Sequence, residues 1–332
     1  MHTPNRPLVI GHRGASGYRP EHTRAAYELA FTLGADAVEP DIVATKDGVL
    51  VLRHENEISG TTDVAGHPEF ADRRTTKVID GLTLSGWFTE DFTWPELSTL
   101  RAMERLPAIR TGAASFNGTG RILRLTDLLG IIDAQERDDL IMVAEIKHPT
   151  YFESIGLPLD ELFTREIAGW ATPANLIVES FEQTVLGLIR DRGIPGRYVF
   201  LVESSGSPAD LVARYGTRAL PYSAHLTSAG LARLARELDG VSVDKQLLLR
   251  TDAAGKVTGT TDLVDRAHAA GLEIYTWTLR AENRFLARNL WRGSSARDFG
   301  DWLTEFRLII DTGVDGVFTD QPDLVLAALA AD

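Results

Sequence analysis

Short apolar runs rich in Val and Ile alternate along most of the chain with longer stretches of helical periodicity. Runs that are apolar on both faces are typical of strands in a buried parallel sheet, and amphipathic stretches between them are typical of crossover helices. The runs span residues 8–12, 37–43, 141–147, 176–181, 198–203, 240–244, 272–278 and 316–319. The clearest helical stretches span residues 23–33, 184–192, 226–237 and 261–270. Eight such units predict an α/β fold, a TIM (β/α)₈ barrel, as a single domain over residues 1–332.

Glycine residues mark the ends of several predicted helices. Gly34, Gly193, Gly271 and Gly313 each lie just before a predicted strand. Because glycine adopts the left-handed conformation that often ends a helix, these four positions are expected to have positive φ angles.

Residues 56–120 interrupt this alternation, because they contain no clear strand and helix unit. We interpret them as an insertion, since the rest of the chain is close to the roughly 250 residues of a typical barrel. Just before them, Asp47-Gly48 lies between two apolar runs and predicts a hairpin that turns the chain back after the second barrel strand. The insertion is therefore expected to leave from the carboxyl ends of the strands. Its aromatic residues either cap an active site there or form a small core of their own: Trp87, Phe88, Phe92 and Trp94.

Composition narrows the class of protein. The 332 residues carry a net charge of −13, which argues against a generic nucleic-acid partner, because such proteins need a basic surface. The chain has no cysteine, which excludes disulfide frameworks, thiolate metal sites and thiol nucleophiles. Its apolar stretches are too short for a membrane span. Residues 1–7 do not resemble a signal peptide, so we expect a cytoplasmic protein, with export after removal of a leader as the alternative.

Charged residues lie near the ends of the second and third predicted strands. One strand contains Glu39 and Asp41, and the next ends in Glu145-Ile146-Lys147. Chemistry in barrels of this class gathers at the carboxyl ends of the strands. Side chains alternate along a strand, so Glu39 and Asp41 point to one side, and Glu145 and Lys147 also share a side. If that side is the barrel axis, three carboxylates and a lysine converge.

Buried carboxylates are too costly to keep ionised without compensating positive charge, so this cluster indicates a bound divalent cation. Ligation through the oxygens of Glu39, Asp41 and Glu145 favours Mg²⁺ or Ca²⁺ over zinc. Pro40 lacks the N–H that a central strand uses, which predicts a bulge or a strand end at that residue.

Two histidines are candidates for proton transfer. His12 ends the first strand and His54 ends the hairpin return, and two imidazoles can serve as acid and base near neutral pH. Arg13, among glycines, and Lys147 add positive charge for an anion. These groups favour a phosphodiester over a sugar, because a glycosidase needs two free carboxylates and no metal. The remaining histidines are interpreted as surface or structural residues: His2, His22, His67, His148, His225 and His268.

The same residues lie in motifs that resemble the glycerophosphodiester phosphodiesterase family. The motifs follow one another in order from residue 9 to residue 322. They are His12-Arg13-Gly14-Ala15, Pro20-Glu21-His22-Thr23, Glu39-x-Asp41, Thr45-Lys46-Asp47-Gly48, His54, Glu145-Ile146-Lys147, Ser180-Phe181, Trp277-Thr278 and Gly316-Val317-Phe318-Thr319-Asp320-Gln321-Pro322. The long insertion is similar to that of the larger bacterial-type members.

The resemblance implies a TIM-barrel enzyme that hydrolyses glycerophosphodiesters, such as glycerophosphocholine, to sn-glycerol 3-phosphate and an alcohol. It implies that His12 and His54 are the catalytic pair. It also implies that Glu39, Asp41 and Glu145 hold one Ca²⁺ or Mg²⁺ ion.

Four further positions match residues with supporting roles in the family. Arg13 and Lys147 match phosphate contacts, Glu21 matches a residue that supports the ligands from behind, and Trp277 matches an aromatic that lines the pocket. Two positions depart from the family pattern, because His22 stands where asparagine is commonest and Glu55 stands where aspartate is usual. We expect neither to touch the proposed ligands.

Two other functions fit these residues. A phosphodiesterase of the lysophospholipase D type acts on lipid headgroups and needs an apolar groove, which the aromatic residues of the insertion could supply. A non-catalytic module that binds phosphate-bearing ligands is the other, although binding alone does not need a matched acid and base. The expected partner in each case is a small molecule, and the sequence does not predict an oligomeric state.

Overall fold

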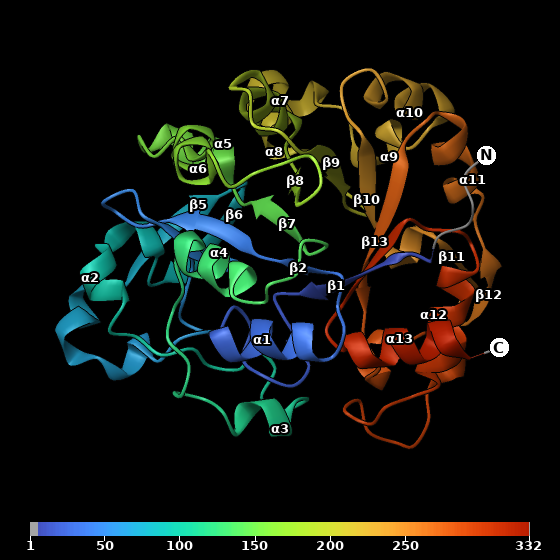
Figure 1. The fold of residues 1–332 in the computed structure, drawn as a ribbon, viewed down its shortest axis with the longest axis horizontal. Coiled ribbons are helices and arrows are strands. Elements are labelled where there is room, and N and C mark those ends of the chain that lie inside the picture. Colours follow the sequence, from blue (N-terminus) through green and yellow to red (C-terminus); the bar gives the residue numbers. More distant parts are fainter. Residues whose placement is uncertain (1–5, 332) are drawn as a thin grey trace.

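The strands close into a parallel barrel in the computed structural model, which describes residues 6–331 (Figure 1). The second barrel strand consists of two segments, β2 and β3, and β1 pairs with both β2 and β14 to complete the ring of eight. The segments are β1 (Leu8–His12), β2 (Ala37–Glu39), β3 (Asp41–Ala44), β7 (Ile141–Ile146), β8 (Leu176–Ser180), β9 (Arg197–Val202), β10 (Gly240–Asp244), β13 (Glu273–Leu279) and β14 (Gly316–Thr319). The predicted barrel is therefore confirmed.

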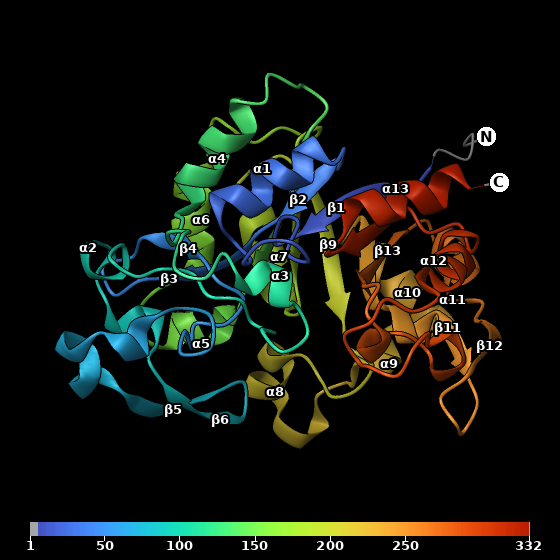
Figure 2. The same cartoon turned by 90° about the horizontal axis from the view of Figure 1, so that it is seen from below.

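Helices follow the barrel strands and cover the outside of the barrel (Figure 2). They are α1 (Arg24–Thr32), α4 (Leu125–Asp133), α5 (Pro149–Ser154), α6 (Leu159–Ile167), α7 (Gln183–Asp191), α8 (Ala209–Tyr215), α9 (Tyr222–His225), α10 (Ser228–Leu234), α11 (Leu263–Ala269), α12 (Trp302–Ile310) and α13 (Pro322–Ala330). Four of them, α1, α7, α10 and α11, confirm the predicted helical stretches. The last helix, α13, packs beside β1, where the ring closes (Figure 2).

The predicted glycine positions end helices as expected. Gly34, Gly193, Gly271 and Gly313 have φ angles of +94°, +81°, +83° and +87°. This left-handed geometry turns the chain from each helix toward the next strand, and it is unfavourable for residues with a Cβ atom.

One apolar layer fills the inside of the barrel, and a polar layer lies above it toward the carboxyl ends of the strands. The apolar layer consists of Ile10, Ala37, Ile141, Val143, Ile177, Val199, Tyr275 and Phe318. Residues two positions apart on a strand point the same way. The residues that follow this layer by two positions include five titratable ones: His12, Glu39, Glu145, Glu179 and Asp320. The alternation that builds the core therefore also aims charged groups at the mouth of the barrel.

The second barrel strand is interrupted at Pro40, as predicted. β2 ends one residue before it and β3 begins one residue after it. β4 (Leu50–Leu52) returns antiparallel beside β3, with Val43 opposite Val51. Gly48 lies in the connecting turn with a φ angle of +74°. The predicted hairpin is therefore confirmed, and it directs the chain out of the barrel.

The segment between β4 and α4 packs against the barrel, and most of its buried apolar side chains are continuous with the core outside the strands. Its regular elements are β5 (Thr75–Ile79), β6 (Leu82–Gly86), α2 (Trp94–Leu97) and α3 (Thr111–Ala114). Phe88 and Phe92 are fully buried, and the ring of Phe92 packs edge-on against Phe70 with centroids 5.0 Å apart. These aromatics therefore pack inside the insertion, whereas the tip of the β5–β6 hairpin is the part that reaches the mouth of the barrel. A second hairpin, β11 (Leu249–Thr251) with β12 (Val257–Thr260), follows β10.

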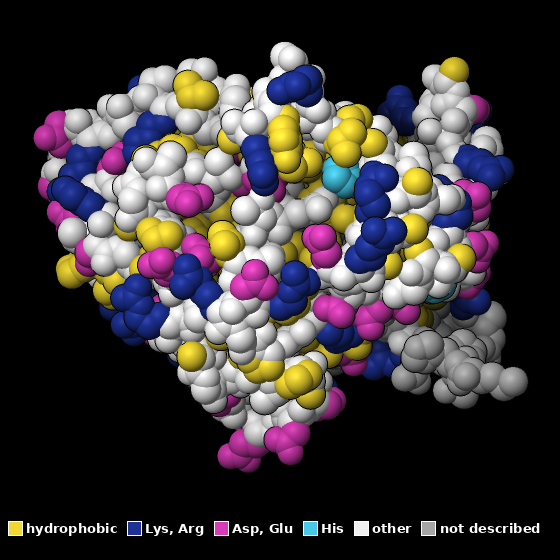
Figure 3. Space-filling view, turned by 90° about the horizontal axis from the view of Figure 1, so that it is seen from above, with side chains coloured by type: hydrophobic (Ala, Val, Ile, Leu, Met, Phe, Trp, Pro, Cys, Tyr) yellow, Lys and Arg dark blue, Asp and Glu magenta, His cyan; other side chains and the backbone are white. Residues whose placement is uncertain are grey.

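The outer surface carries charges of both signs. Lys and Arg side chains are intermingled with Asp and Glu on the face drawn in Figure 3. Arg192 and Asp160, at 2.7 Å, link α7 to α6, whereas Arg266 and Asp262, at 3.0 Å, pair within α11 and the residue that precedes it. Within residues 6–331, no helix combines the length and apolarity that a membrane crossing requires.

We expect Phe318→Ala to lower the free energy of unfolding by about 3–5 kcal/mol, because it opens a cavity beneath the polar layer. Phe318 is 2% exposed within the apolar layer. Chemical denaturation measures the change, and Leu303→Ala, at a side chain that is 38% exposed on α12, is the control. A loss for Phe318→Ala no larger than that of the control contradicts the role of this layer in stability.

Candidate active site

The polar layer brings residues of neighbouring strands to the same height. His12 of β1 lies in register with Glu39 of β2, and Asp41 of β3 lies in register with Glu145 of β7. Glu145 in turn lies in register with Glu179 of β8. Five titratable side chains therefore meet at the carboxyl ends of adjacent strands, where barrels of this class carry their chemistry.

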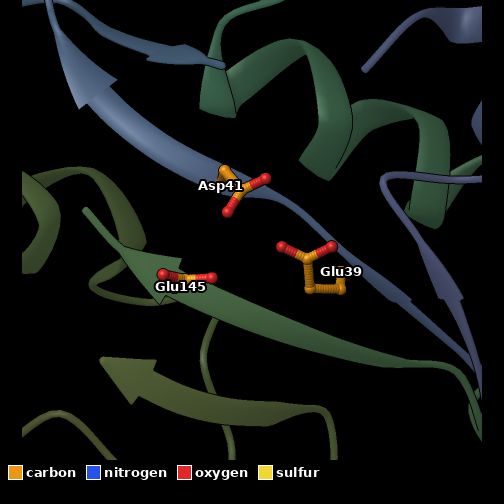
Figure 4. A group of neighbouring side chains, drawn as sticks. All are labelled: Glu39, Asp41 and Glu145. Atoms are coloured by element: carbon orange, nitrogen blue, oxygen red, sulfur yellow. The ribbon is translucent and has the colours of Figure 1, made fainter. Parts of the chain in front are cut away.

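Glu39, Asp41 and Glu145 form a buried acidic cluster (Figure 4). One carboxylate oxygen of each lies within 4.8 Å of the others, and Figure 4 shows the three carboxyl groups turned toward a common space. Burial raises the pKa of Glu145 to about 8, and burial together with Asp41 raises the pKa of Glu39 well above its usual range. Three acidic groups so close together need positive charge to be ionised at once.

Two basic side chains supply part of that charge. Arg13 Nε lies 3.0 Å from Asp41 Oδ2, and the backbone N–H of Arg13 donates to Glu39 Oε2 at 2.9 Å. Lys147 Nζ lies 2.8 Å from Glu145 Oε1 and 3.7 Å from Asp41 Oδ1. Burial opposes ionisation of Asp41, but Arg13 holds the pKa of that carboxyl well below its usual range. Asp41 is therefore the carboxylate that stays charged most readily.

Oxygens of the acidic cluster remain available for a cation. Within residues 6–331, Glu39 Oε1 and Asp41 Oδ1 have no hydrogen-bond partner, and neither does Oε2 of the neighbouring Glu179. Carboxylate oxygens are the ligands that Mg²⁺ and Ca²⁺ prefer. Glu39, Asp41 and Glu145 can therefore hold one divalent cation, and the donor set suits either metal.

His12 is held by a residue from the other end of the chain. Its Nδ1 lies 2.6 Å from Oδ1 of Asp320, which follows β14. Burial opposes ionisation of Asp320, but Arg280 and Arg110 hold its pKa well below its usual range. An ionised carboxylate accepts hydrogen bonds and donates none, so Nδ1 of His12 carries a proton. Burial and Arg13 lower the pKa of His12 to about 4, which leaves the ring neutral near pH 7 with Nε2 able to accept a proton.

His54 follows β4 and lines the same cleft as His12. Its Nδ1 pairs with Oε1 of the adjacent Glu55. Enclosure and the positive charge of Arg13 lower the pKa of His54. Both candidate catalytic histidines therefore have a carboxylate at Nδ1 and a neutral ring near pH 7.

The expectation that neither His22 nor Glu55 touches the proposed ligands is wrong for His22. His22 is fully buried, with Nε2 2.9 Å from Asp41 Oδ2 and Nδ1 2.7 Å from the hydroxyl of Tyr27. Glu55 pairs with His54 and Arg105, neither of which is a proposed ligand. The reason is tertiary, because the loop after β1 passes behind β3 and brings His22 against a ligand candidate 19 residues away.

The supporting residues lie beside the cluster. Glu21 Oε2 accepts a hydrogen bond from Arg13 Nη1 at 3.1 Å, so it holds a residue that contacts the cluster. Trp277, on β13, lines the cleft and packs edge-on against Phe181 with ring centroids 5.8 Å apart. The structure therefore places Glu21 behind Arg13 and Trp277 in the wall of the cleft, and their roles stay predictions.

Four of the remaining histidines have partners outside the acidic cluster, and one of them, His148, also lines the cleft that contains His12. The partners are Asp63 and Glu69 for His67, Asp80 for His148, Gln183 for His225 and Asp315 for His268. His2 lies outside the described residues. His22 is thus the one histidine of this group that contacts a proposed ligand within residues 6–331.

Several charged residues of the site had no predicted role: Arg105, Arg110, Glu179, Arg280 and Asp320. Two of them could have been predicted from the sequence, because Glu179 and Asp320 each follow an inward-pointing apolar residue by two positions. Arg105 and Arg110 could not have been predicted in this way, since they lie in an irregular part of the insertion.

A cleft of about 1230 Å³ opens above the polar layer. Its floor includes the predicted site residues His12, Arg13, Glu39, His54, Glu145, Lys147 and Trp277. Its rim includes Val78 and Leu82 at the tip of the β5–β6 hairpin and Val212 on α8. These three side chains are 63%, 66% and 46% exposed, so the cleft has a charged floor and a partly apolar mouth.

Comparison with known proteins finds relatives that belong to one family. The chain matches the Glycerophosphoryl diester phosphodiesterase family over residues 12–324. It is 30% identical to the glycerophosphodiester phosphodiesterase GDPD6 of Arabidopsis thaliana, over 95% of this chain and 84% of that protein. It is 25% identical to the glycerophosphodiester phosphodiesterase of Treponema pallidum (strain Nichols), over 96% of this chain and 90% of that protein. Its fold is similar to that of an Oleispira antarctica phosphodiesterase solved with the product sn-glycerol-3-phosphate, with a TM-score of 0.62, 19% identity and 98% of each chain covered.

Proposed function

The chain belongs to the glycerophosphoryl diester phosphodiesterase family, and from that premise we propose how this phosphodiesterase works. It hydrolyses glycerophosphodiesters such as glycerophosphocholine to sn-glycerol 3-phosphate and an alcohol. Glu39, Asp41 and Glu145 hold one divalent cation, Ca²⁺ or Mg²⁺, and His12 and His54 transfer protons. Because the chain is an enzyme, the alternative of a non-catalytic binding module is set aside.

One observation carries this proposal. Two histidines, each with a carboxylate at Nδ1, line the same cleft as a buried acidic cluster with unpartnered oxygens. Arg13 and Lys147 line that cleft as well and offer positive charge to a phosphodiester. Acid, base, cation ligands and phosphate-binding groups are the parts that phosphodiester hydrolysis needs.

The reaction has two balanced halves. In the first, one histidine takes the proton of the glycerol hydroxyl beside the phosphate while its oxygen bonds to phosphorus, and the other histidine protonates the departing alcohol oxygen. In the second, water attacks the resulting cyclic phosphate and the histidines exchange roles. Arg13 and Lys147 stabilise the charge that grows on the phosphate oxygens. A bound divalent cation supplies Lewis-acid stabilisation of the same oxygens.

Product identification tests the proposed reaction. Incubation of the protein with glycerophosphocholine and Mg²⁺ or Ca²⁺ is expected to release choline and sn-glycerol 3-phosphate, with a cyclic glycerophosphate detected by ³¹P NMR in single turnovers. Release of phosphocholine and glycerol contradicts the bond assigned. Absence of any product from folded protein contradicts the substrate class.

The apolar mouth of the cleft favours a second candidate substrate, a lysophospholipid. Val78, Leu82 and Val212 are large apolar side chains with high exposure at the rim. The headgroup of a water-soluble diester gains little from contact with these side chains. An acyl chain that packs against them gains about 25 cal/mol of binding free energy per Å² of apolar surface removed from water. In this candidate reaction residues 56–120 cap the active site through their hairpin, and the phosphate chemistry is unchanged.

We expect Leu82→Asp to lower kcat/KM for lysophosphatidylcholine by about 10-fold or more, since pocket contacts of this size contribute about 1–3 kcal/mol. The same change is expected to leave glycerophosphocholine hydrolysis within about twofold of the unmodified enzyme. Leu188→Asp, at a 39% exposed side chain on α7, is the matched control and is expected to change neither substrate. Equal effects of Leu82→Asp on both substrates, or no cleavage of lysophosphatidylcholine, contradict this second candidate.

A further inference from the structure

Two arginines of the insertion reach the active site from a stretch without regular structure between α2 and α3. Arg105 and Arg110 belong to the segment of 56–120, and Arg110 is the residue that precedes α3. Their side chains are 27% and 7% exposed. Each of them contacts the carboxylate that holds one of the two candidate catalytic histidines.

Arg110 is connected to His12 through Asp320. Its Nη2 donates to Asp320 Oδ2 at 2.5 Å, and the other oxygen of Asp320 contacts His12 Nδ1 at 2.6 Å. Arg110 also donates from Nε to Glu282 Oε1 at 2.7 Å, which fixes the plane of the guanidinium. Arg280 Nε contacts the same Oδ2 at 2.6 Å from the cleft side. Asp320 is therefore held between two arginines, and the buried one comes from the insertion.

Arg105 is connected to His54 through Glu55. Its Nη1 and Nη2 donate to the two oxygens of Glu55 at 2.9 Å and 2.7 Å, and Glu55 Oε1 pairs with His54 Nδ1. The same guanidinium donates from Nε and Nη2 to the two oxygens of Glu21, at 2.9 Å and 2.6 Å. Glu21 Oε2 in turn accepts from Arg13. One arginine therefore orients both a histidine and the phosphate-binding Arg13.

We propose that Arg105 and Arg110 are positioning residues through which the insertion sets the orientation of both catalytic histidines. The two-pronged contact of Arg105 fixes the plane of Glu55. Arg110 and Arg280 both contact one oxygen of Asp320, which leaves its other oxygen for His12. A carboxylate held in this way fixes the tautomer and the direction of the imidazole that donates to it. The histidines point Nε2 at the substrate while these pairs are intact. The insertion thus completes the proton-transfer machinery, in addition to covering it. This inference rests on the proposed function, because it takes His12 and His54 as the proton-transfer pair.

Steady-state kinetics of Arg105→Gln and Arg110→Gln test the inference. Both are expected to lower kcat for glycerophosphocholine by about 10²-fold, the cost of a small misplacement of a catalytic group, while KM changes less. Arg73→Gln is the matched control, because Arg73 lies in the same insertion and makes a two-pronged contact with Glu96, at 2.9 Å and 2.5 Å, away from the cleft. Its kcat is expected to stay within about twofold of the unmodified enzyme.

A second substrate separates positioning from general damage to the fold. In the p-nitrophenyl ester of sn-glycerol 3-phosphate the leaving oxygen departs without protonation, so a misplaced acid no longer slows the first half of the reaction. We expect one arginine variant to regain most of its rate on this ester. The histidine linked to that arginine is then the acid, and its alanine variant is expected to show the same recovery.

Several outcomes overturn the inference. One is a kcat within twofold of the unmodified enzyme for both arginine variants. Another is an equal loss on both substrates in both variants together with a large fall in unfolding temperature, which identifies the arginines as structural ties. If Arg110→Gln does not fold, the test uses Arg110→Lys in its place. It also uses Arg105→Gln, at the more exposed of the two side chains. Full activity of His12→Ala and His54→Ala instead overturns the proposed function itself.

Discussion

Replacement of His12 by alanine is expected to lower kcat by about 10²–10⁴-fold, the range for loss of a general acid or base. His12 is 8% exposed in the cleft, and Asp320 holds its Nδ1 at 2.6 Å. Asp320 is a poor replacement for the imidazole, because two arginines hold it in its ionised form and so oppose its protonation. Initial rates of sn-glycerol 3-phosphate release measure the effect, and His54→Ala is expected to fall in the same range.

The control for this result is His268→Ala. His268 contacts Asp315 at 2.9 Å, before β14, at the end of the barrel away from the cleft. Its replacement is expected to leave kcat unchanged. Near-normal kcat for folded His12→Ala and His54→Ala contradicts the proposed pair, and a fall for His268→Ala of similar size attributes the loss to general destabilisation.

Removal of divalent cations with a chelator is expected to abolish activity, and added Mg²⁺ or Ca²⁺ is expected to restore it. The reason is that Glu39, Asp41 and Glu145 lie buried within 4.8 Å of one another, where their charges need a counter-ion. Binding to the folded state alone stabilises a protein by about 2.7 kcal/mol at a cation concentration of 100 times Kd. A rise in unfolding temperature on adding the cation therefore gives a readout that does not depend on turnover.

The variant Glu39→Gln tests whether the cation binds at the acidic cluster. Burial and Asp41 raise the pKa of Glu39, so folding without the cation near pH 7 must either bury an ionised carboxylate or take up a proton, and both cost stability. A group with a raised folded-state pKa loses stability as the pH rises toward that value, and the neutral amide removes this loss. Glu39→Gln is expected to be inactive, to unfold at a higher temperature than the unmodified enzyme without cation, and to show no further rise with cation.

Glu273→Gln is the control variant. Glu273 pairs with Arg197 at 3.0 Å where β13 begins, at the opposite end of the strands from the acidic cluster. It is expected to retain both activity and the cation-dependent rise. Retention of the rise by Glu39→Gln contradicts its assignment as a ligand. Activity that survives exhaustive chelation contradicts the metal requirement.

The regular part of the site could be predicted from local patterns. The alternation of Val143 with Glu145 along one strand is visible in the sequence, and register then places Glu145 beside Asp41. Pro40 likewise marked the strand break, because a missing N–H acts locally. Glu179 follows the same rule after Ile177 and was open to the same reasoning.

The residues that hold the histidines could not be predicted in this way. The contact of His12 with Asp320 spans 308 residues, and that of Arg110 with Asp320 spans 210. Such contacts depend on how the ring closes and on an irregular insertion, for which no periodicity exists. The aromatic residues of the insertion suggested a cap, yet Phe88 and Phe92 are buried inside it and the hairpin tip reaches the cleft instead.

The pairing of β1 with β14 has a consequence for synthesis of the chain. His12 leaves the ribosome more than 300 residues before Asp320. The proton-transfer site therefore cannot be complete on a nascent chain that ends before residue 320, even if the acidic cluster has already folded. Hydrolysis begins after the last strand has been made and inserted beside the first, so the start of activity reports that the ring has closed.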